Sequence, residues 1–375
     1  METIANKVTE AEAVSKFLPG EKILTLKRHG NGHINDTFFL ETDRDRYILQ
    51  RINHEIFKDP QKLMENIYAI TTHLKKAIRK NGGDENRESL TVIKTSDDKL
   101  LYEDADGGFW RMYLFIKDAV CLEKVEKPED FYESALAFGN FQRMLSDFDP
   151  KILHETIPDF HNTPKRYDDF EKAVALDKLG RAANVSKEIE FVRSHREEMG
   201  LGEKLLREGK LPLRVTHNDT KLNNIMMDKK TGKGITIIDL DTVMPGLAIY
   251  DFGDSIRFGA NTAAEDETDL SKVSLDLGLF RVYAEGFIKG AAGGLTDEEI
   301  KMLPYGAKNM TMECGMRFLT DHLLGDTYFK IHRENHNLDR ARDQFALVAD
   351  MEAKWDEMQE IIEKIMRDQK EKIYA

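Results

Sequence analysis

The chain has 375 residues, of which 41% are hydrophobic and 33% charged, a balance typical of a folded globular protein rather than a disordered one. Its 68 acidic and 55 basic side chains give a formal net charge of −13, which argues against a nucleic-acid or anionic-membrane partner. The start lacks the apolar core of a signal peptide, and no stretch approaches the roughly 18 apolar residues of a membrane span, so we predict a cytoplasmic protein.

The first third of the chain predicts short strands around one long helix. A short amphipathic helix over 8–18 comes first, and a longer one over 60–80 has apolar residues at a helical period. Strand-like runs with polar or glycine-containing turns between them surround the second helix. They cover 22–30, 36–42, 46–52, 90–95, 99–104 and 107–116.

After residue 117 the pattern becomes mainly helical. Helical periods cover 128–145, 166–179 and 185–209, and a final long helix has apolar positions 345, 348, 351, 355, 358, 362 and 365. Two strand-like pieces interrupt at 213–217 and 234–241. We therefore predict an α+β fold of two lobes, a small β-rich N-terminal lobe (1–117) and a larger, mainly helical C-terminal lobe (118–375).

The strongest chemical pattern is "THNDTKLNNI" at 216–225, which matches H-x-D-x-x-x-x-N through His217, Asp219 and Asn224. Phosphoryl transfer to a hydroxyl needs an acceptor for the hydroxyl proton and oxygen ligands for Mg²⁺, and an Asp and an Asn on one loop supply both. A strand–loop–strand hairpin would bring Asp239 beside Asn224 as the carboxylate ligand of the metal. His217 is more simply a packed loop residue than a base, and Lys221 is either a cation beside the transferred phosphate or a solvated lysine.

A second pattern, Asp251-Phe252-Gly253, has the letters of the magnesium-binding DFG of protein kinases. It lies too far beyond Asn224 and opens a helix, so Asp239 is the better metal ligand. Asp241, on the same face of the extended segment as Asp239, is an alternative that shares or replaces the metal role. Asp251 or Asp254 is then expected to hold the catalytic loop in place.

The blocks "THNDTKLNN", "IIDLDT" and "YDFGDSIRFGA" resemble the aminoglycoside phosphotransferase and choline kinase superfamily. With "GHIN", "RYILQ" and "TMECGMRFL", the similarity is closer to the N-acetylhexosamine 1-kinases, from about residue 25 to the final helix. This resemblance implies a protein-kinase-like fold that uses ATP and Mg²⁺ to phosphorylate the anomeric hydroxyl of a free N-acetylhexosamine. Asp219 would be the base, with Lys221 beside it, and Asn224 and Asp239 would hold the metal.

On the nucleotide side, the resemblance places the phosphate-covering loop at "HGNGHINDT" and the adenine-binding hinge near Phe115 and Lys117. Gln50 stands where kinases carry a phosphate-binding lysine, which indicates either a regulatory pseudokinase or compensation by Mg²⁺ and Lys221. We prefer compensation. The predicted nucleotide-binding residues are Gly30, Gly32, Asn35, Thr37, Gln50, Phe115 and Lys117.

For the acceptor, the resemblance indicates His33, Phe258, Arg317 and Tyr328 as the lining of the sugar pocket, together with Asp219. A structural ion pair for Arg317 and helix packing for Tyr328 are equally simple interpretations. Rival functions are phosphorylation of another small alcohol, such as homoserine, choline or an aminoglycoside, and a non-catalytic nucleotide-binding protein. We expect a monomer, and the sequence does not distinguish GlcNAc from GalNAc.

Overall fold

The computed structural model describes residues 4–30 and 34–374. Its N-terminal part is a six-stranded antiparallel sheet with the order β1-β2-β3-β6-β4, in which β5 also pairs with β6. The strands are β1 (Ile23–Arg28), β2 (Asp36–Thr42), β3 (Arg46–Ile52), β4 (Val92–Ile93), β5 (Tyr102–Glu103) and β6 (Phe109–Leu114). This confirms the predicted strands, although the fourth and fifth are only two residues long.

The two faces of this sheet have different neighbours. On β2, Phe38 and Leu40 are buried against Val14 and Phe17 of helix α1 (Ile4–Phe17), which covers the outer face. Side chains alternate along a strand, so Thr37 on β2 and its cross-strand partner Gln50 on β3 lie on the other face. That inner face turns toward the helical part of the molecule.

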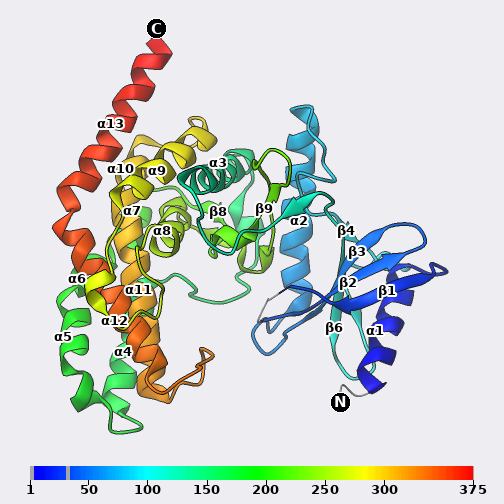
Figure 1. Ribbon diagram of the computed structural model, residues 1–375, viewed down its shortest axis with the longest axis horizontal. Helices are drawn as coiled ribbons and strands as arrows, with labels where there is room; N and C mark the ends of the chain where they lie inside the picture. The colour runs from blue at the N-terminus through cyan, green and yellow to red at the C-terminus, as the bar shows by residue number, and fades with distance from the viewer. Residues whose placement is uncertain (1–3, 31–33, 375) are drawn as a thin grey trace.

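Helix α2 (Pro60–Lys80) stands between the sheet and the helical part (Figure 1). The side chain of Asp59 caps its first turn by accepting a hydrogen bond from the Lys62 amide at 3.1 Å. Its apolar stripe, which includes Leu63 and Ile67, is buried in a core that continues into the C-terminal part. The helix predicted over 60–80 is therefore confirmed, and it joins the two halves through one core.

The C-terminal part is mainly helical, and two helix pairs, α3 with α9 and α8 with α11, make its most extensive contacts. Its helices are α3 (Pro128–Met144), α4 (Thr163–Leu176), α5 (Ser186–Ser194), α6 (Arg196–Met199), α7 (Leu201–Arg207), α8 (Ala248–Gly259), α9 (Leu277–Ala291), α10 (Asp297–Lys301), α11 (Leu303–Leu324), α12 (His336–Ala353) and α13 (Trp355–Tyr374). The whole is an α+β, protein-kinase-like fold with a β-rich N-terminal part.

Short strands frame the loop that carries the H-x-D-x-x-x-x-N pattern. β8 (Arg214–Thr216) precedes the loop and pairs with β11 (Met244–Gly246). After the loop, β9 (Ile225–Asp228) forms a hairpin with β10 (Gly234–Ile237) and also pairs with β7 (Ala119–Val120). The predicted hairpin between 213–217 and 234–241 is therefore wrong, because each piece pairs with a strand that the sequence patterns did not reveal.

The prediction of one long final helix is also wrong, because the chain forms two separate helices there, α12 and α13. Lys354 leaves the helical conformation (φ −102°, ψ 14°) at the junction. Its Nζ donates to Ser274 Oγ at 2.6 Å, to the Leu275 carbonyl oxygen at 2.9 Å and to Asp350 Oδ2 at 2.8 Å. These bonds tie the junction to the loop before α9, a contact that hydrophobic periodicity cannot report.

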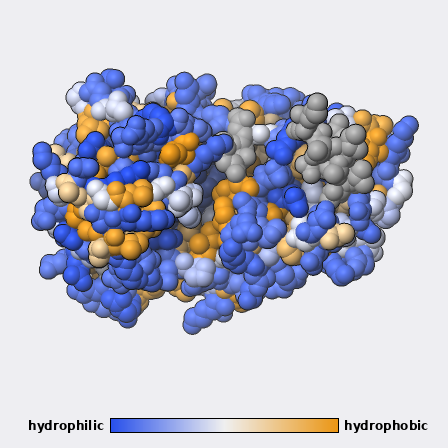
Figure 2. All heavy atoms as spheres, turned by 90° about the horizontal axis from the view of Figure 1, so that it is seen from below, coloured by the Kyte–Doolittle hydropathy of each residue, from blue (hydrophilic) through white to orange (hydrophobic). Residues whose placement is uncertain are grey.

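The face of the molecule drawn in Figure 2 is largely hydrophilic, with smaller hydrophobic areas between the polar side chains. None of the helices within the described ranges combines the length and the apolar character required to cross a bilayer.

Candidate active site

The loop between β8 and β9 presents the Asp219 carboxylate in a fixed orientation. Lys221 Nζ lies 2.7 Å from Asp219 Oδ1, and Asn224 Nδ2 donates to Asp219 Oδ2 at 3.1 Å and to its carbonyl oxygen at 2.8 Å. Desolvation by itself would lower the pKa of Lys221, but the Asp219 carboxylate raises it above the ordinary lysine value. The Asp219 side chain remains 27% exposed, so it can receive a proton from a bound molecule.

His217 of the same loop is fully buried and serves the loop's structure. The Asp219 amide donates to its Nδ1 at 3.3 Å, so Nε2 carries the proton and donates to the Ile238 carbonyl oxygen at 2.9 Å. Its ring also lies edge-on to Phe138, with centroids 5.5 Å apart. Both nitrogens are occupied inside the protein, which agrees with the prediction of a packed loop residue.

Asp239 follows β10 and is held in the left-handed region, at φ 58° and ψ 56°. The residue retains solvent-accessible surface, although protein atoms lie close around its carboxylate. This desolvation, with the neighbouring carboxylates of Asp241 and Asp219, raises the pKa of Asp239 to about 7. Within the described ranges, no hydrogen bond or ion pair reaches its carboxylate. The backbone strand register brings it close to Asn224, because the Ile238 amide donates to the Asn224 carbonyl oxygen at 2.9 Å.

These residues fit a divalent cation. The Asp239 carboxylate, which no hydrogen bond or ion pair engages in the described chain, and a nearby amide oxygen are the oxygen donors that Mg²⁺ prefers. Asn224 uses its Nδ2 within the loop, which leaves its Oδ1 for a ligand. Asp239 and Asn224 are therefore the residues that could hold the metal.

Asp241 has a different role from its neighbour. It is buried, and Arg111 donates to both of its carboxylate oxygens at 2.5 and 2.9 Å. Asn35 Nδ2 donates to the same carboxylate at 2.6 Å. With both oxygens engaged by the N-terminal sheet, Asp241 joins the two parts of the molecule, and this geometry disfavours the alternative that it binds the metal.

Gln50 and Arg111 are direct cross-strand partners on β3 and β6. Arg111 Nε donates to Gln50 Oε1 at 2.9 Å, and Gln50 Nε2 donates to Thr37 Oγ1 at 2.9 Å. The sheet thus has a buried cation one strand away from the position at which kinases carry their lysine. Sequence reasoning missed Arg111, although a charge inside the apolar strand "FWRMYLF" is itself a sign of a buried partner.

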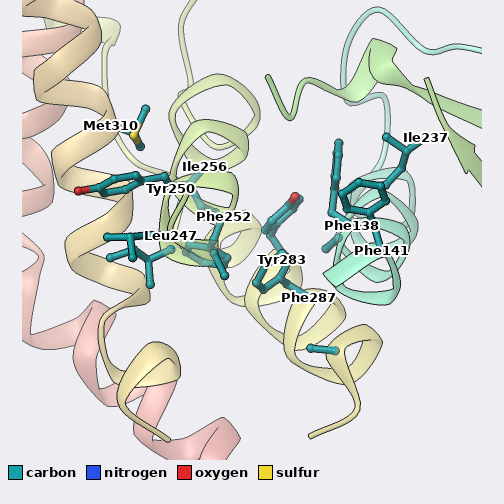
Figure 3. Packing of buried hydrophobic residues seen from close by; sticks show 14 of the residues in the cluster. Phe138, Phe141, Ile237, Leu247, Tyr250, Phe252, Ile256, Tyr283, Phe287 and Met310 are labelled. Atoms are coloured by element: carbon teal, nitrogen blue, oxygen red, sulfur yellow. The ribbon is translucent and has the colours of Figure 1, made fainter. Parts of the chain in front are cut away.

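The Asp251-Phe252-Gly253 tripeptide lies at the start of α8 and is structural. The buried Asp251 carboxylate accepts hydrogen bonds from three donors at 2.8–2.9 Å, namely the amides of His217 and Asn218 and the side chain of Gln142. Phe252 packs among Tyr283 and Phe287 in the core (Figure 3). A Cβ on Gly253 would lie 2.2 Å from the carbonyl oxygen of Gly306 on α11, so only glycine fits this helix crossing. Asp254 also anchors the loop, because Thr220 donates its amide to Asp254 at 3.0 Å.

Of the predicted nucleotide-binding residues, Thr37 and Gln50 lie on the inner face of the sheet, and Asn35 directly precedes β2. Gly30 has a positive φ of 75°, as a tight turn requires, whereas the predicted Gly32 and His33 lie outside the described residues. Asn35 also accepts a hydrogen bond from the Asn53 amide at 2.9 Å, which fixes the entry to β2.

At the predicted hinge, the ring of Phe115 packs edge-on against Phe39, with centroids 5.2 Å apart. Lys117 Nζ lies 2.7 Å from Asp45, so its side chain is directed to the sheet and only its backbone is free to meet a ligand. The aromatic residues Trp110 and Tyr113 before it are buried.

The predicted acceptor residues divide into two places. Arg317 lies over three aromatic rings at 5.4–5.9 Å, those of Phe160, Tyr328 and Phe329. Among residues 4–30 and 34–374 no carboxylate lies within 4.0 Å of its guanidinium, so the interpretation as a structural ion pair is not supported. Phe258 instead lines a pocket of about 690 Å³ between 123–128 and the end of α8.

The fold and this loop define a two-lobed phosphotransferase of the kinase-like type. Residues 25–283 match the phosphotransferase enzyme family known as APH, and the chain belongs to that family. It is an ATP-dependent phosphotransferase of the aminoglycoside phosphotransferase and choline kinase type.

Similar solved structures support the fold. A microcompartment-associated aminopropanol kinase has a TM-score of 0.60 and 14% identity, covering 94% of this chain and 98% of its own. An aminoglycoside phosphotransferase from Alicyclobacillus acidocaldarius has a TM-score of 0.59 and 13% identity, covering 96% and 95%. An ethanolamine kinase from Plasmodium vivax has a TM-score of 0.55 and 15% identity, covering 92% and 89%.

Proposed function

We propose that this protein transfers the γ-phosphoryl group of ATP to the anomeric hydroxyl of a free N-acetylhexosamine, giving the α-1-phosphate. In this proposal the nucleotide binds the N-terminal lobe (1–117), and the acceptor and the catalytic groups belong to the C-terminal lobe (118–375). The proposal rests on the resemblance of the sequence blocks, and the contacts of the acceptor region support it.

Asp219 accepts the proton of the sugar hydroxyl. As it does so, the hydroxyl oxygen forms a bond to the γ-phosphorus, and the bond between the γ-phosphorus and the β-phosphate oxygen breaks. Lys221 holds the carboxylate at 2.7 Å and places a positive charge beside the transferred group. Asn224 fixes the other carboxylate oxygen at 3.1 Å, so the base does not have to reorient during the reaction.

Asn224 and Asp239 would hold Mg²⁺, which neutralises phosphate charge when it is bound. The left-handed backbone at Asp239 supports this role, since non-glycine residues in that region cluster at functional sites. Gly30, Asn35, Thr37 and the hinge at Phe115 line the nucleotide side. Gln50 is neutral, and Lys221 together with the metal provides the charge that a strand lysine would provide.

The observation that carries the choice of acceptor is Arg317, a guanidinium stacked on three rings without a carboxylate partner in the described chain. Phe160 beneath it is followed directly by His161, whose Nε2 lies 3.1 Å from the Asn218 carbonyl oxygen, so this cation lies near the loop that carries Asp219. An unpaired cation repels an ammonium group and attracts hydroxyl and amide oxygens. An uncharged sugar amide therefore suits the site better than choline, ethanolamine or an aminoglycoside. Tyr328, 61% exposed, offers the sugar a ring face and a hydroxyl.

The test is ADP release by the purified protein with ATP, Mg²⁺ and separate acceptors: GlcNAc, GalNAc, glucose, choline, homoserine and an aminoglycoside. We expect turnover with an N-acetylhexosamine. Glucose should react more slowly, because each pocket group left without its amide partner costs about 1–3 kcal/mol. Preference for choline, homoserine or the aminoglycoside would refute the sugar assignment, and the absence of turnover with every acceptor would favour a non-catalytic protein.

A further inference from the structure

The residue immediately before Asp219 is held in an unusual backbone conformation. Asn218 has a φ of 66°, in the left-handed region. Its amide donates to Asp251 at 2.8 Å, and its Nδ2 donates to the Thr242 carbonyl oxygen at 2.8 Å. The backbone amide and the side-chain amide of Asn218 are therefore both fixed by the C-terminal part. The remaining polar group is its carbonyl oxygen, which belongs to the peptide bond between Asn218 and Asp219.

That carbonyl oxygen is contacted by a histidine from a distant segment. His161 Nε2 lies 3.1 Å from the Asn218 oxygen, and His161 Nδ1 lies 2.7 Å from Glu313 Oε1 on α11. The other oxygen of Glu313 accepts a hydrogen bond from Thr163 Oγ1 at 2.6 Å. Both ring nitrogens of His161 face acceptors only, so both bonds form together only when the ring is doubly protonated.

The electrostatic surroundings favour that protonated ring. Desolvation by itself would lower the pKa of His161, but Glu313 overcomes it and raises the pKa above the ordinary histidine value. The charged groups facing the ring from the neighbouring helices are Glu313 and Arg317 of α11 and Asp254 of α8, of which only Arg317 opposes protonation. Tyr250 of α8 faces it as an aromatic ring, with centroids 6.2 Å apart.

We propose that His161 and Glu313 form a positioning pair that sets the orientation of the Asn218–Asp219 peptide, and through it the direction of the Asp219 carboxylate. The step from the pair to catalysis depends on Asp219 being the base of phosphoryl transfer, as proposed above. When His161 loses a proton, one nitrogen turns a lone pair toward an oxygen, and the chain of hydrogen bonds from Glu313 through His161 to the Asn218 carbonyl oxygen is broken. The pair therefore supports turnover at low pH and ceases to do so as the pH rises through the pKa of His161.

The chain provides a matched control. His195 lies in the same part of the molecule, with Nε2 3.0 Å from Glu352 and Nδ1 2.7 Å from the Phe191 carbonyl oxygen. Its side chain is 11% exposed against 10% for His161, but within the described chain no hydrogen bond or ion pair joins it to the loop at 217–224. His195→Gln thus reports the cost of losing a similar histidine–glutamate pair away from the site.

The experiment compares His161→Gln, Glu313→Gln and His195→Gln in the full-length protein. With the best acceptor, His161→Gln should lower kcat by about 10- to 100-fold, as small misplacements of catalytic groups do, with KM for ATP unchanged. Glu313→Gln should move the alkaline limb of the wild-type pH profile to lower pH, and His161→Gln should remove that limb. His195→Gln should leave kcat and the profile unchanged.

Hydrogen exchange of the peptide covering 216–221, measured without any acceptor, separates this inference from the sugar assignment. Exchange there should be faster in His161→Gln than in wild type or His195→Gln, even if no sugar is a substrate. Equal exchange in His161→Gln and His195→Gln would overturn the positioning role, as would equal kcat values. If His161 had a purely structural role, His161→Gln would lower the thermal midpoint without changing the pH profile of kcat, and this result would also overturn the positioning role.

Discussion

At the scale of single residues, four aspartates within about 35 positions of one another have four different environments. Asp219 is partly open and oriented by Lys221 and Asn224. Asp239 lies near the carboxylates of Asp241 and Asp219 and forms no direct ion pair within the described chain. Asp241 is neutralised by Arg111, and Asp251 is buried among backbone amides. Environment, and not residue type, separates the proposed base and the proposed metal ligand from the structural acids.

Asp219→Asn keeps the shape of the loop but removes the proton acceptor. Turnover should fall by about 10²–10⁴, the usual contribution of general base catalysis. ADP affinity, measured by calorimetry, should stay close to the wild-type value, because the proposed nucleotide site is formed mainly by the sheet. Near-normal turnover would exclude Asp219 as the base.

Asp239→Asn should mainly affect activity, whereas Asp251→Asn should mainly affect stability. Asp239→Asn should abolish Mg²⁺-dependent turnover without lowering the thermal midpoint of the metal-free protein, because it relieves repulsion among carboxylates. Asp251→Asn should lower the free energy of unfolding by about 1–3 kcal/mol, since a buried acceptor of backbone amides is lost. If Asp251→Asn loses metal dependence while Asp239→Asn stays active, the two roles are reversed.

At the scale of elements, the β3–β6 strand pair and the segment after β10 connect the two parts through a buried ion pair. Arg111 and Asp241 have only 2% and 4% of their side-chain surfaces exposed. Removing one partner of such a pair leaves an uncompensated buried charge, which is far more costly than losing an exposed pair. The Arg111–Asp241 ion pair therefore holds the sheet, which has Gln50 in place of the kinase lysine, in position relative to the loop that carries Asp219.

Arg111→Met should therefore lower the free energy of unfolding by about 3–5 kcal/mol in urea titrations. The control is Arg46→Met, which breaks the exposed cross-strand pair with Glu41 and should cost about 0–1 kcal/mol. Equal costs for the two variants would show that the buried pair does not stabilise the connection.

Gly253→Ala tests the crossing of α8 and α11. Its methyl group would meet the Gly306 carbonyl oxygen at 2.2 Å, and overpacking of this kind costs about 1–3 kcal/mol or more. Gly200→Ala is the control, because a Cβ there meets only Pro164 Cγ, at an ordinary 3.6 Å. Thermal unfolding of both variants should show a clear loss only for Gly253→Ala, and an unchanged Gly253→Ala would mean that the helices separate at little cost.

At the scale of the whole molecule, local patterns predicted the two-part layout and the loop bearing Asp219 and Asn224. The periodicity of 60–80 and the strand alternation of 36–52 were sufficient for the sheet and α2. Arg111, His161 and Glu313 could not be found this way, because their partners lie more than 50 positions away and only the folded chain brings them together. The break at Lys354 has the same cause, since residues 274–275 supply its partners.

The position of phosphorylation tests the proposed function most directly. Product formed from GlcNAc or GalNAc, ATP and Mg²⁺ would be examined by phosphorus NMR with proton coupling to the sugar. We predict a sugar 1-phosphate with the α configuration, because attack by the anomeric oxygen leaves the anomeric C–O bond intact. A 6-phosphate, or the absence of any sugar phosphate, would contradict the assignment.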